Sequence, residues 1–266
     1  MLVYRRPPQG LNFICKLFTV PGIQLGVPGL TLKHFLHDSM HTLELGVLAY
    51  ICSKILWRLV EFGFFGHYNP GETDAIHAAM PQQLKHHYES TGVKSYDRID
   101  NMCLKLLGTW TAPALKAKAG PMKSILPWML ELLSDKGGAA LLDGPLGCEG
   151  SALLECCVAL RRIYEICKRE PRRMSSDSLV ELQTLGQNVV RQWQRSGGRI
   201  TMKFHVLAEH LADQMAFAGN MTWSHNYADE SCNYESRLRG SSCNRMAYSR
   251  MFLSKWYLNF WGDSQA

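Results

Sequence analysis

The residues best suited to chemistry stand together in the segment His37-Asp38-Ser39-Met40-His41, where one carboxylate lies between two imidazoles. If the segment is helical, Asp38 and His41 share one face, as do His37 and His41. A carboxylate beside an imidazole can bind a divalent metal ion, with the second group either binding it too or orienting the first through a hydrogen bond. The alternative is a helix N-terminus at which Asp38 complements the helix dipole. The spacing leaves both interpretations open.

A second group of chemical residues occurs near the C-terminal end of the chain. His205 and His210 are five residues apart, so a regular helix would not place both on one clean face, and the spacing alone argues against a metal site made of these two. Glu230 and Glu235 are suitable metal carboxylates if the loop that precedes them folds back against Asp38. The alternative is a solvated acidic patch beside aromatic core residues.

Basic residues form two further groups. Cations of this kind would make salt-sensitive contacts to nucleic-acid phosphates that do not depend on base sequence. Surface helices also carry such charges without any partner, so a solvated face is the alternative. The larger group contains Arg161, Arg162, Lys168, Arg169, Arg172 and Arg173, and the smaller contains Lys116, Lys118 and Lys123.

Composition indicates an ordinary globular protein. The 266 residues are 46% hydrophobic and 20% charged, and the formal net charge of +6 is compatible with a nucleic-acid partner without requiring one. No apolar run reaches the ~20 residues that a membrane-spanning helix needs. The nine cysteines form no C-x-x-C pair, which predicts reduced, buried thiols rather than a zinc finger or a disulfide scaffold. We therefore expect a soluble, intracellular protein without a membrane partner.

The apolar periodicity predicts a mainly α fold of amphipathic helices with a few short strands. Residues 1–30 are rich in Gly and Pro and are expected to be irregular, with one short strand at 11–20. Residues 31–266 are expected to form a single mostly helical domain, with a Gly-rich loop at 137–147 as its best internal boundary. Helices are predicted at 31–64, 72–90 (interrupted by Pro81), 96–107, 113–134 (with a break or start at Pro127), 151–169, 176–197, 203–219 and 241–261.

The order of the motifs gives a resemblance to a known family. Asp38-x-Met40-His41 followed by Leu45-Gly46-Val47 resembles the D-x-M-H…L-G-V signature of DDE/D transposases of the CACTA and Plavaka-like groups, whose catalytic domain has an RNase H-like core. The stretch from Lys203 to His210 is similar to the K-F-H-x-L-x-x-H stretch of these enzymes. The G…W…Y-x-x-E pattern that carries their last acid resembles Gly219, Trp223, Tyr227 and Glu230.

The resemblance implies a role for each matching residue. Asp38 matches the second catalytic acid and Glu230 the third, and together they would hold two divalent ions, Mg²⁺ or Mn²⁺, that activate the nucleophile and stabilise the leaving oxygen at a DNA phosphate. His41 would be a hydrogen-bonding partner of these ligands. The partner implied is DNA, its backbone gripped by Arg161, Arg162, Arg172, Arg173, Lys116 and Lys118. In a eukaryote such a protein would be nuclear.

One departure from the family bears on activity. The first catalytic acid of these transposases lies on an early strand, upstream of the D-x-M-H helix, whereas residues 1–37 contain no Asp or Glu. The chain thus resembles a transposase catalytic domain truncated before its first acid, and we expect no strand transfer from it alone. Two alternatives remain. One is a non-enzymatic helical module that binds protein or nucleic acid, and the other is a metal-dependent hydrolase built on His37 and His41.

Overall fold

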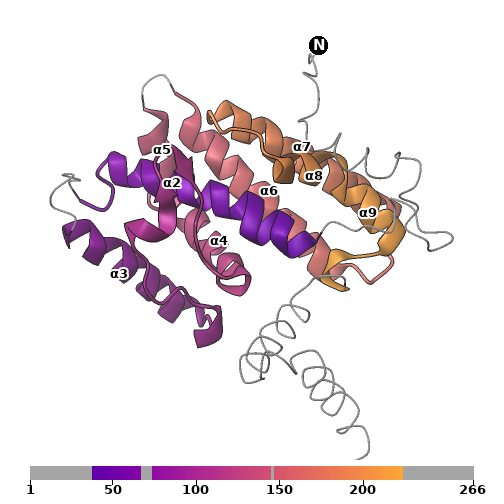
Figure 1. The fold of residues 1–266 in the computed structure, drawn as a ribbon, viewed down its shortest axis with the longest axis horizontal. Coiled ribbons are helices and arrows are strands. Elements are labelled where there is room, and N and C mark those ends of the chain that lie inside the picture. Colours follow the sequence, from indigo (N-terminus) through magenta and orange to yellow (C-terminus); the bar gives the residue numbers. More distant parts are fainter. Residues whose placement is uncertain (1–37, 67–73, 145–146, 224–266) are drawn as a thin grey trace, which may run out of the picture. The chain divides into compact units, whose positions relative to one another are not determined.

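The computed structural model describes residues 38–66, 74–144 and 147–223 and shows a mainly helical protein, as the sequence predicts (Figure 1). The chain divides into two compact units, Met1–Ser224 and His225–Ala266, and all the described residues belong to the first. The single domain expected over 31–266 stays a prediction, because residues 224–266 lie outside the described residues. The strand expected at 11–20 and the helix expected at 241–261 lie outside the described residues. None of the described helices is long and apolar enough to cross a membrane.

The elements follow one another in a simple order. The first is a π-helix, η2, which runs directly into the α-helix α2. The bounds are η2 (Met40–Leu48), α2 (Ala49–Glu61), α3 (Asp74–Thr91), the 3-10 turns η3 (Ser95–Asp97) and η4 (Leu104–Leu107), β1 (Gly108–Thr109), β2 (Ala112–Pro113), α4 (Ala119–Leu133), α5 (Gly138–Asp143), α6 (Glu149–Arg169), α7 (Ser176–Arg195), α8 (Met202–Glu209), α9 (Leu211–Ala218) and the 3-10 turn η5 (Met221–Trp223).

The continuous helix formed by η2 and α2 lies in the core. Its apolar residues recur at helical spacing, and Leu43, Val47, Ile51, Ile55 and Leu59 are fully buried. It packs against α4 and α8 through η2, and against α6 through α2. Burying one such side chain contributes about 1.5–3 kcal/mol, so this row supplies much of the driving force for folding.

Helices α6 and α7 form the most extensive helix pair of the fold. The N-cap of α7 is Ser175, whose hydroxyl oxygen accepts a hydrogen bond from the backbone N–H of Ser178. Cys156 and Cys167 of α6 are buried free thiols, and burial raises the pKa of each to about 12. These cysteines therefore act as small apolar core residues, as the sequence predicts.

Two helix predictions are wrong for local reasons. The predicted helix at 96–107 is replaced by the turns η3 and η4, with non-helical backbone between them. Pro127 does not break α4, which runs through it from Ala119 to Leu133. Pro127 is exposed, as is Lys123, whose carbonyl loses its helical partner, and the neighbouring Trp128 is fully buried.

Two further departures concern the connections. The loop predicted at 137–147 contains the short helix α5, whose residues pack against α6. The single helix predicted at 203–219 is broken at His210, where φ is −126° and ψ is −23°. The two strands of the described residues are short. They pair antiparallel, with Gly108 opposite Pro113 and Thr109 opposite Ala112.

Candidate functional site

Asp38 lies at the start of the first helix and binds the helix's own backbone. Its carbonyl accepts the N–H of Thr42 at 3.0 Å. Its carboxylate accepts the N–H of Met40 at Oδ1 and the N–H of His41 at Oδ2, each at 3.2 Å. The imidazole Nδ1 of His41 also contacts Oδ2. The structure thus shows Asp38 as an N-terminal cap of the helix, which satisfies backbone donors that would otherwise lack partners.

The expected metal ligands are only partly within the described residues. The Asp38–His41 contact is the kind that a partner of a metal ligand makes, and the His41 ring is half exposed. Glu230, the match to the last acid, lies outside the described residues, as do His37 and Glu235. Over 38–66, 74–144 and 147–223, no three His, Cys, Asp or Glu residues gather closely enough to hold a metal ion. The predicted metal site remains a prediction.

The two motif segments, more than 150 residues apart in the sequence, meet in the structure. The Lys203 Nζ donates a hydrogen bond to the backbone carbonyl of Leu45 at 2.8 Å. Its aliphatic chain crosses Gly46 so closely that a Cβ there would lie 2.4 Å from the Lys203 Cδ. The same Cβ would lie 2.8 Å from the carbonyl oxygen of His41. Only glycine therefore fits at this point of η2.

The residue after Lys203 fixes α8 from the other side. Phe204 is fully buried and stacks on Trp193 of α7, with ring centroids 5.0 Å apart and planes 9° apart. The indole N–H of Trp193 donates to the carbonyl of Arg199 at 2.9 Å. Stacking and hydrogen bonding therefore orient the start of α8, from which Lys203 reaches η2.

His205 and His210 come together although the sequence spacing argues against it. Their Nε2 atoms are 3.2 Å apart and their rings meet edge to face. Both side chains are partly exposed at the end of α8. Burial and the neighbouring His210 ring lower the pKa of His205, which favours its neutral form.

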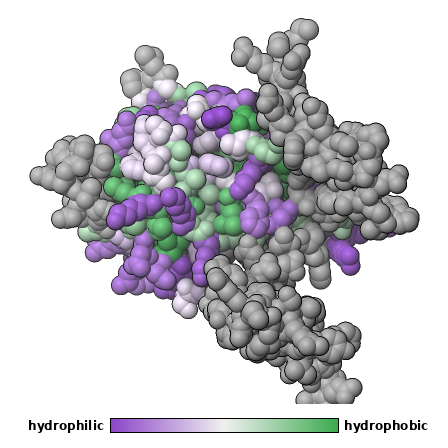
Figure 2. Space-filling model, viewed as in Figure 1, coloured by the Kyte–Doolittle hydropathy of each residue, from purple (hydrophilic) through white to green (hydrophobic). Residues whose placement is uncertain are grey.

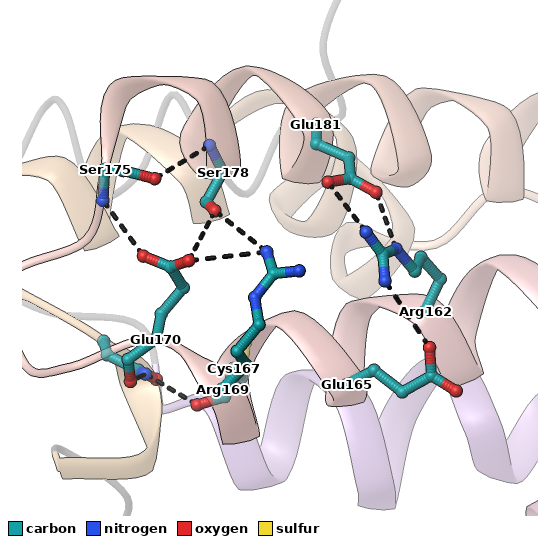
Figure 3. A network of polar contacts seen from close by, with 9 residues as sticks. Arg162, Glu165, Cys167, Arg169, Glu170, Ser175, Ser178 and Glu181 are labelled. Carbon is teal, nitrogen blue, oxygen red and sulfur yellow. Dashed lines mark hydrogen bonds and ion pairs between the residues drawn. The ribbon is translucent and has the colours of Figure 1, made fainter.

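The predicted DNA-binding arginines of α6 are engaged in ion pairs. The Arg162 guanidinium makes two hydrogen bonds to Glu181 of α7, at 2.6 and 3.2 Å, and also approaches Glu165 at 3.7 Å (Figure 3). Arg161 pairs with Glu165 at 3.5 Å. The sequence could not reveal the Arg162–Glu181 pair, because Glu181 lies on the next helix. The positive charges of these two arginines are therefore paired with glutamates, which leaves them less suited to bind a phosphate.

Other predicted cations are exposed. Arg172 and Arg173 lie in the turn between α6 and α7, and Lys116 and Lys118 lie just before α4. Within the part of the chain that the structure describes, no carboxylate pairs with Arg172, Arg173, Lys116 or Lys118. On the face that Figure 2 shows, hydrophilic residues alternate with smaller hydrophobic areas.

Asn220, which follows α9, binds the backbone at the end of α6 and in the α6–α7 turn. Its amide Nδ2 donates to the carbonyls of Cys167 and Glu170, at 2.7 and 2.8 Å, and its backbone N–H donates to the carbonyl of Arg172. The side chain is 1% exposed. Although Asn220-Met221-Thr222 has the form of a glycosylation sequon, the amide is committed to these contacts in the folded protein.

Sequence reasoning missed one buried acid. Glu44 of η2 is 4% exposed, its Oε1 lies 3.5 Å from the Lys123 Nζ, and its Oε2 has no hydrogen-bond partner among the described residues. Burial raises the pKa of Glu44 to about 7, against the opposing effect of Lys123. No signal in the sequence could have found it, because the burial of Glu44 comes from helices distant in the sequence that pack around η2.

Comparison of the chain with protein-family models, with curated proteins and with solved structures gives no match in any of the three. The resemblance to transposases therefore rests on the sequence motifs alone.

The contact between Lys203 and Gly46 predicts a stability effect. Replacing Gly46→Ala should lower the free energy of unfolding by about 1–3 kcal/mol, because the new methyl group overlaps Lys203 and the His41 carbonyl. The matched control is Gly120→Ala in α4, where the new Cβ would meet only the end of the Asp97 side chain, at 3.2 Å. Urea unfolding measures both. Equal stability of the two variants would contradict the close contact.

The buried Glu44 predicts a pH-dependent stability. Since its pKa is about 7 in the folded protein and 4.5 is its usual value, the folded state binds the proton more tightly, and stability falls as pH rises from about 4.5 to 7. Glu44→Gln should therefore raise the free energy of unfolding by about 3 kcal/mol at pH 8 and change it little at pH 4. The control is Glu89→Gln, at an exposed acid. The same effect of Glu44→Gln at both pH values would refute the assignment.

Proposed function

We propose that this chain is a transposase-derived helical module that binds the DNA backbone and does not carry out strand transfer by itself. The observation that carries the proposal is the contact between Lys203 and the Leu45–Gly46 backbone. It brings together the two segments whose motifs resemble the transposase signature, as residues of one shared site would require.

The role of Asp38 supports the non-catalytic part of the proposal. Both oxygens of its carboxylate already accept backbone hydrogen bonds from the first turn of its own helix. A catalytic acid of a two-ion site must direct oxygen lone pairs toward the ions. In this proposal Asp38 acts as a capping residue, and the acid-free segment before it adds no carboxylate ligand.

The exposed cations of the α6–α7 turn support the DNA-binding part. Arg172 and Arg173 lie in the turn whose backbone Asn220 holds through a hydrogen bond to the Arg172 carbonyl. Two neighbouring exposed guanidinium groups can contact adjacent phosphates, and each contact adds to the salt dependence of binding. Arg161 and Arg162 pair with glutamates, so in this proposal they stabilise the fold rather than bind DNA.

Binding of a fluorescently labelled DNA duplex tests the proposal. We expect binding that weakens steeply between about 50 and 200 mM salt, and a log–log salt slope that falls in magnitude by about 2 in the Arg172→Ala/Arg173→Ala double variant. The matched control, Arg162→Gln, should keep the salt slope of the unmodified chain.

The binding should also survive Asp38→Ala and Glu230→Ala, because a non-catalytic module does not use these acids to hold DNA. Thermal unfolding of each variant establishes that it is folded. Failure of the unmodified chain to bind at low salt, or an unchanged slope in the double variant, would overturn the DNA-binding proposal.

A further inference from the structure

We propose that His205 and His210 form a binding site for a transition-metal ion such as Zn²⁺ or Co²⁺, at the junction of α8 and α9. Asp38 does not gather with the two histidines, and the site does not depend on the function proposed above. It rests on the geometry of the two rings and on the way the backbone around them is held.

A break in the helix makes the site. In a continuous helix, residues five apart point about 140° away from each other, so the two rings would diverge. Here α8 ends at Glu209, His210 has non-helical backbone angles, and α9 begins at Leu211. The break turns the His210 ring back toward His205 until their Nε2 atoms are 3.2 Å apart.

This separation is the one that a shared ion requires. A Zn–N bond is about 2.0–2.1 Å long, and a tetrahedral angle between two such bonds places the nitrogens about 3.3 Å apart. Without an ion, a hydrogen bond between the two Nε2 atoms spans this distance. For both Nε2 lone pairs to bind an ion, the ring that carries the Nε2 proton would exchange it with water and take its proton at Nδ1 instead.

The backbone around the pair is rigid. Gly186 of α7 lies so close to α8 that a Cβ there would be 2.6 Å from the carbonyl oxygen of Leu207. The Gln183 side-chain amide donates to the next carbonyl, that of Ala208. These contacts hold the backbone of Leu207 and Ala208, which lie between the two histidines in the sequence. The backbone of the site is therefore positioned before any ion binds.

The donor set selects the class of ion. Imidazole nitrogens suit Zn²⁺, Co²⁺, Ni²⁺ and Cu²⁺, whereas Mg²⁺ prefers oxygen ligands. Both rings are partly exposed, so an ion from solution can reach them. Among the described residues no third His, Cys, Asp or Glu completes the set, so water or a ligand from elsewhere takes the remaining positions.

Titration of the metal-free full-length chain with Co²⁺ tests the site, because the visible absorption of Co²⁺ reports its nitrogen ligands and geometry. We expect a single equivalent to bind, Zn²⁺ to displace it, and excess Mg²⁺ to leave it in place. His205→Ala and His210→Ala should each weaken binding by more than about tenfold, since even partners that only orient a ligand contribute 10–100-fold. The control His86→Ala removes an exposed histidine of α3 and should bind as the unmodified chain does.

Further measurements separate this site from the predicted magnesium site and from a histidine pair that only stabilises the fold. Asp38→Ala should leave Co²⁺ binding unchanged, because Asp38 does not gather with the two histidines. If a histidine variant fails to fold, oxidation of the unmodified chain with Cu²⁺ and ascorbate decides the matter, because peptide mass spectrometry should locate the damage at His205 and His210. Absence of Co²⁺ and Zn²⁺ binding, binding that survives in a folded double variant, or oxidation elsewhere would overturn the proposal.

Discussion

The hydrogen bond from the Lys203 amine to the Leu45 carbonyl joins α8 to η2, which are far apart in the sequence. It requires a lysine whose chain can cross the helix and a helix turn without a side chain, which Gly46 supplies. Burial lowers the pKa of the Lys203 amine, so the contact also carries a desolvation cost that the carbonyl partly offsets. The positions of η2 and α8 therefore depend on each other.

Close packing also determines the position of α8. Its first turn is held by the Phe204–Trp193 stack, and its last turn lies against Gly186. Close packing therefore holds the backbone of α8, which carries Lys203 near its start and His205 toward its end. The carboxylate of Asp38, the guanidinium of Arg162 and the amide of Asn220 are likewise bound within the fold. Residue types associated with catalysis or modification here stabilise helix ends and helix pairs.

Much of the fold could be predicted because apolar residues recur at helical spacing in α2, α6 and α7. The break at His210 could not, because no glycine or proline marks it and the polar and apolar pattern continues across it. The tolerance of Pro127 depends on which face of α4 meets water, and that is set by tertiary packing.

The candidate site was predictable only in part. The motif spacing points to the segments around Asp38 and Lys203, but it cannot tell a metal ligand from a helix cap, since both use the same carboxylate. The Arg162–Glu181 pair and the buried Glu44 arise from neighbours distant in sequence. A spacing of five residues would keep the rings of His205 and His210 apart in a straight helix. The break at His210 lets the two rings meet.

We propose that the Asp38 segment resembles a transposase motif in sequence but does not carry out the chemistry of that motif. The most direct test incubates the full-length chain with supercoiled and linear DNA in the presence of Mg²⁺ or Mn²⁺ and measures nicking and strand transfer, alongside the Asp38→Ala variant. The account predicts that neither protein cleaves or joins DNA. Metal-dependent cleavage by the unmodified chain that Asp38→Ala abolishes would contradict it.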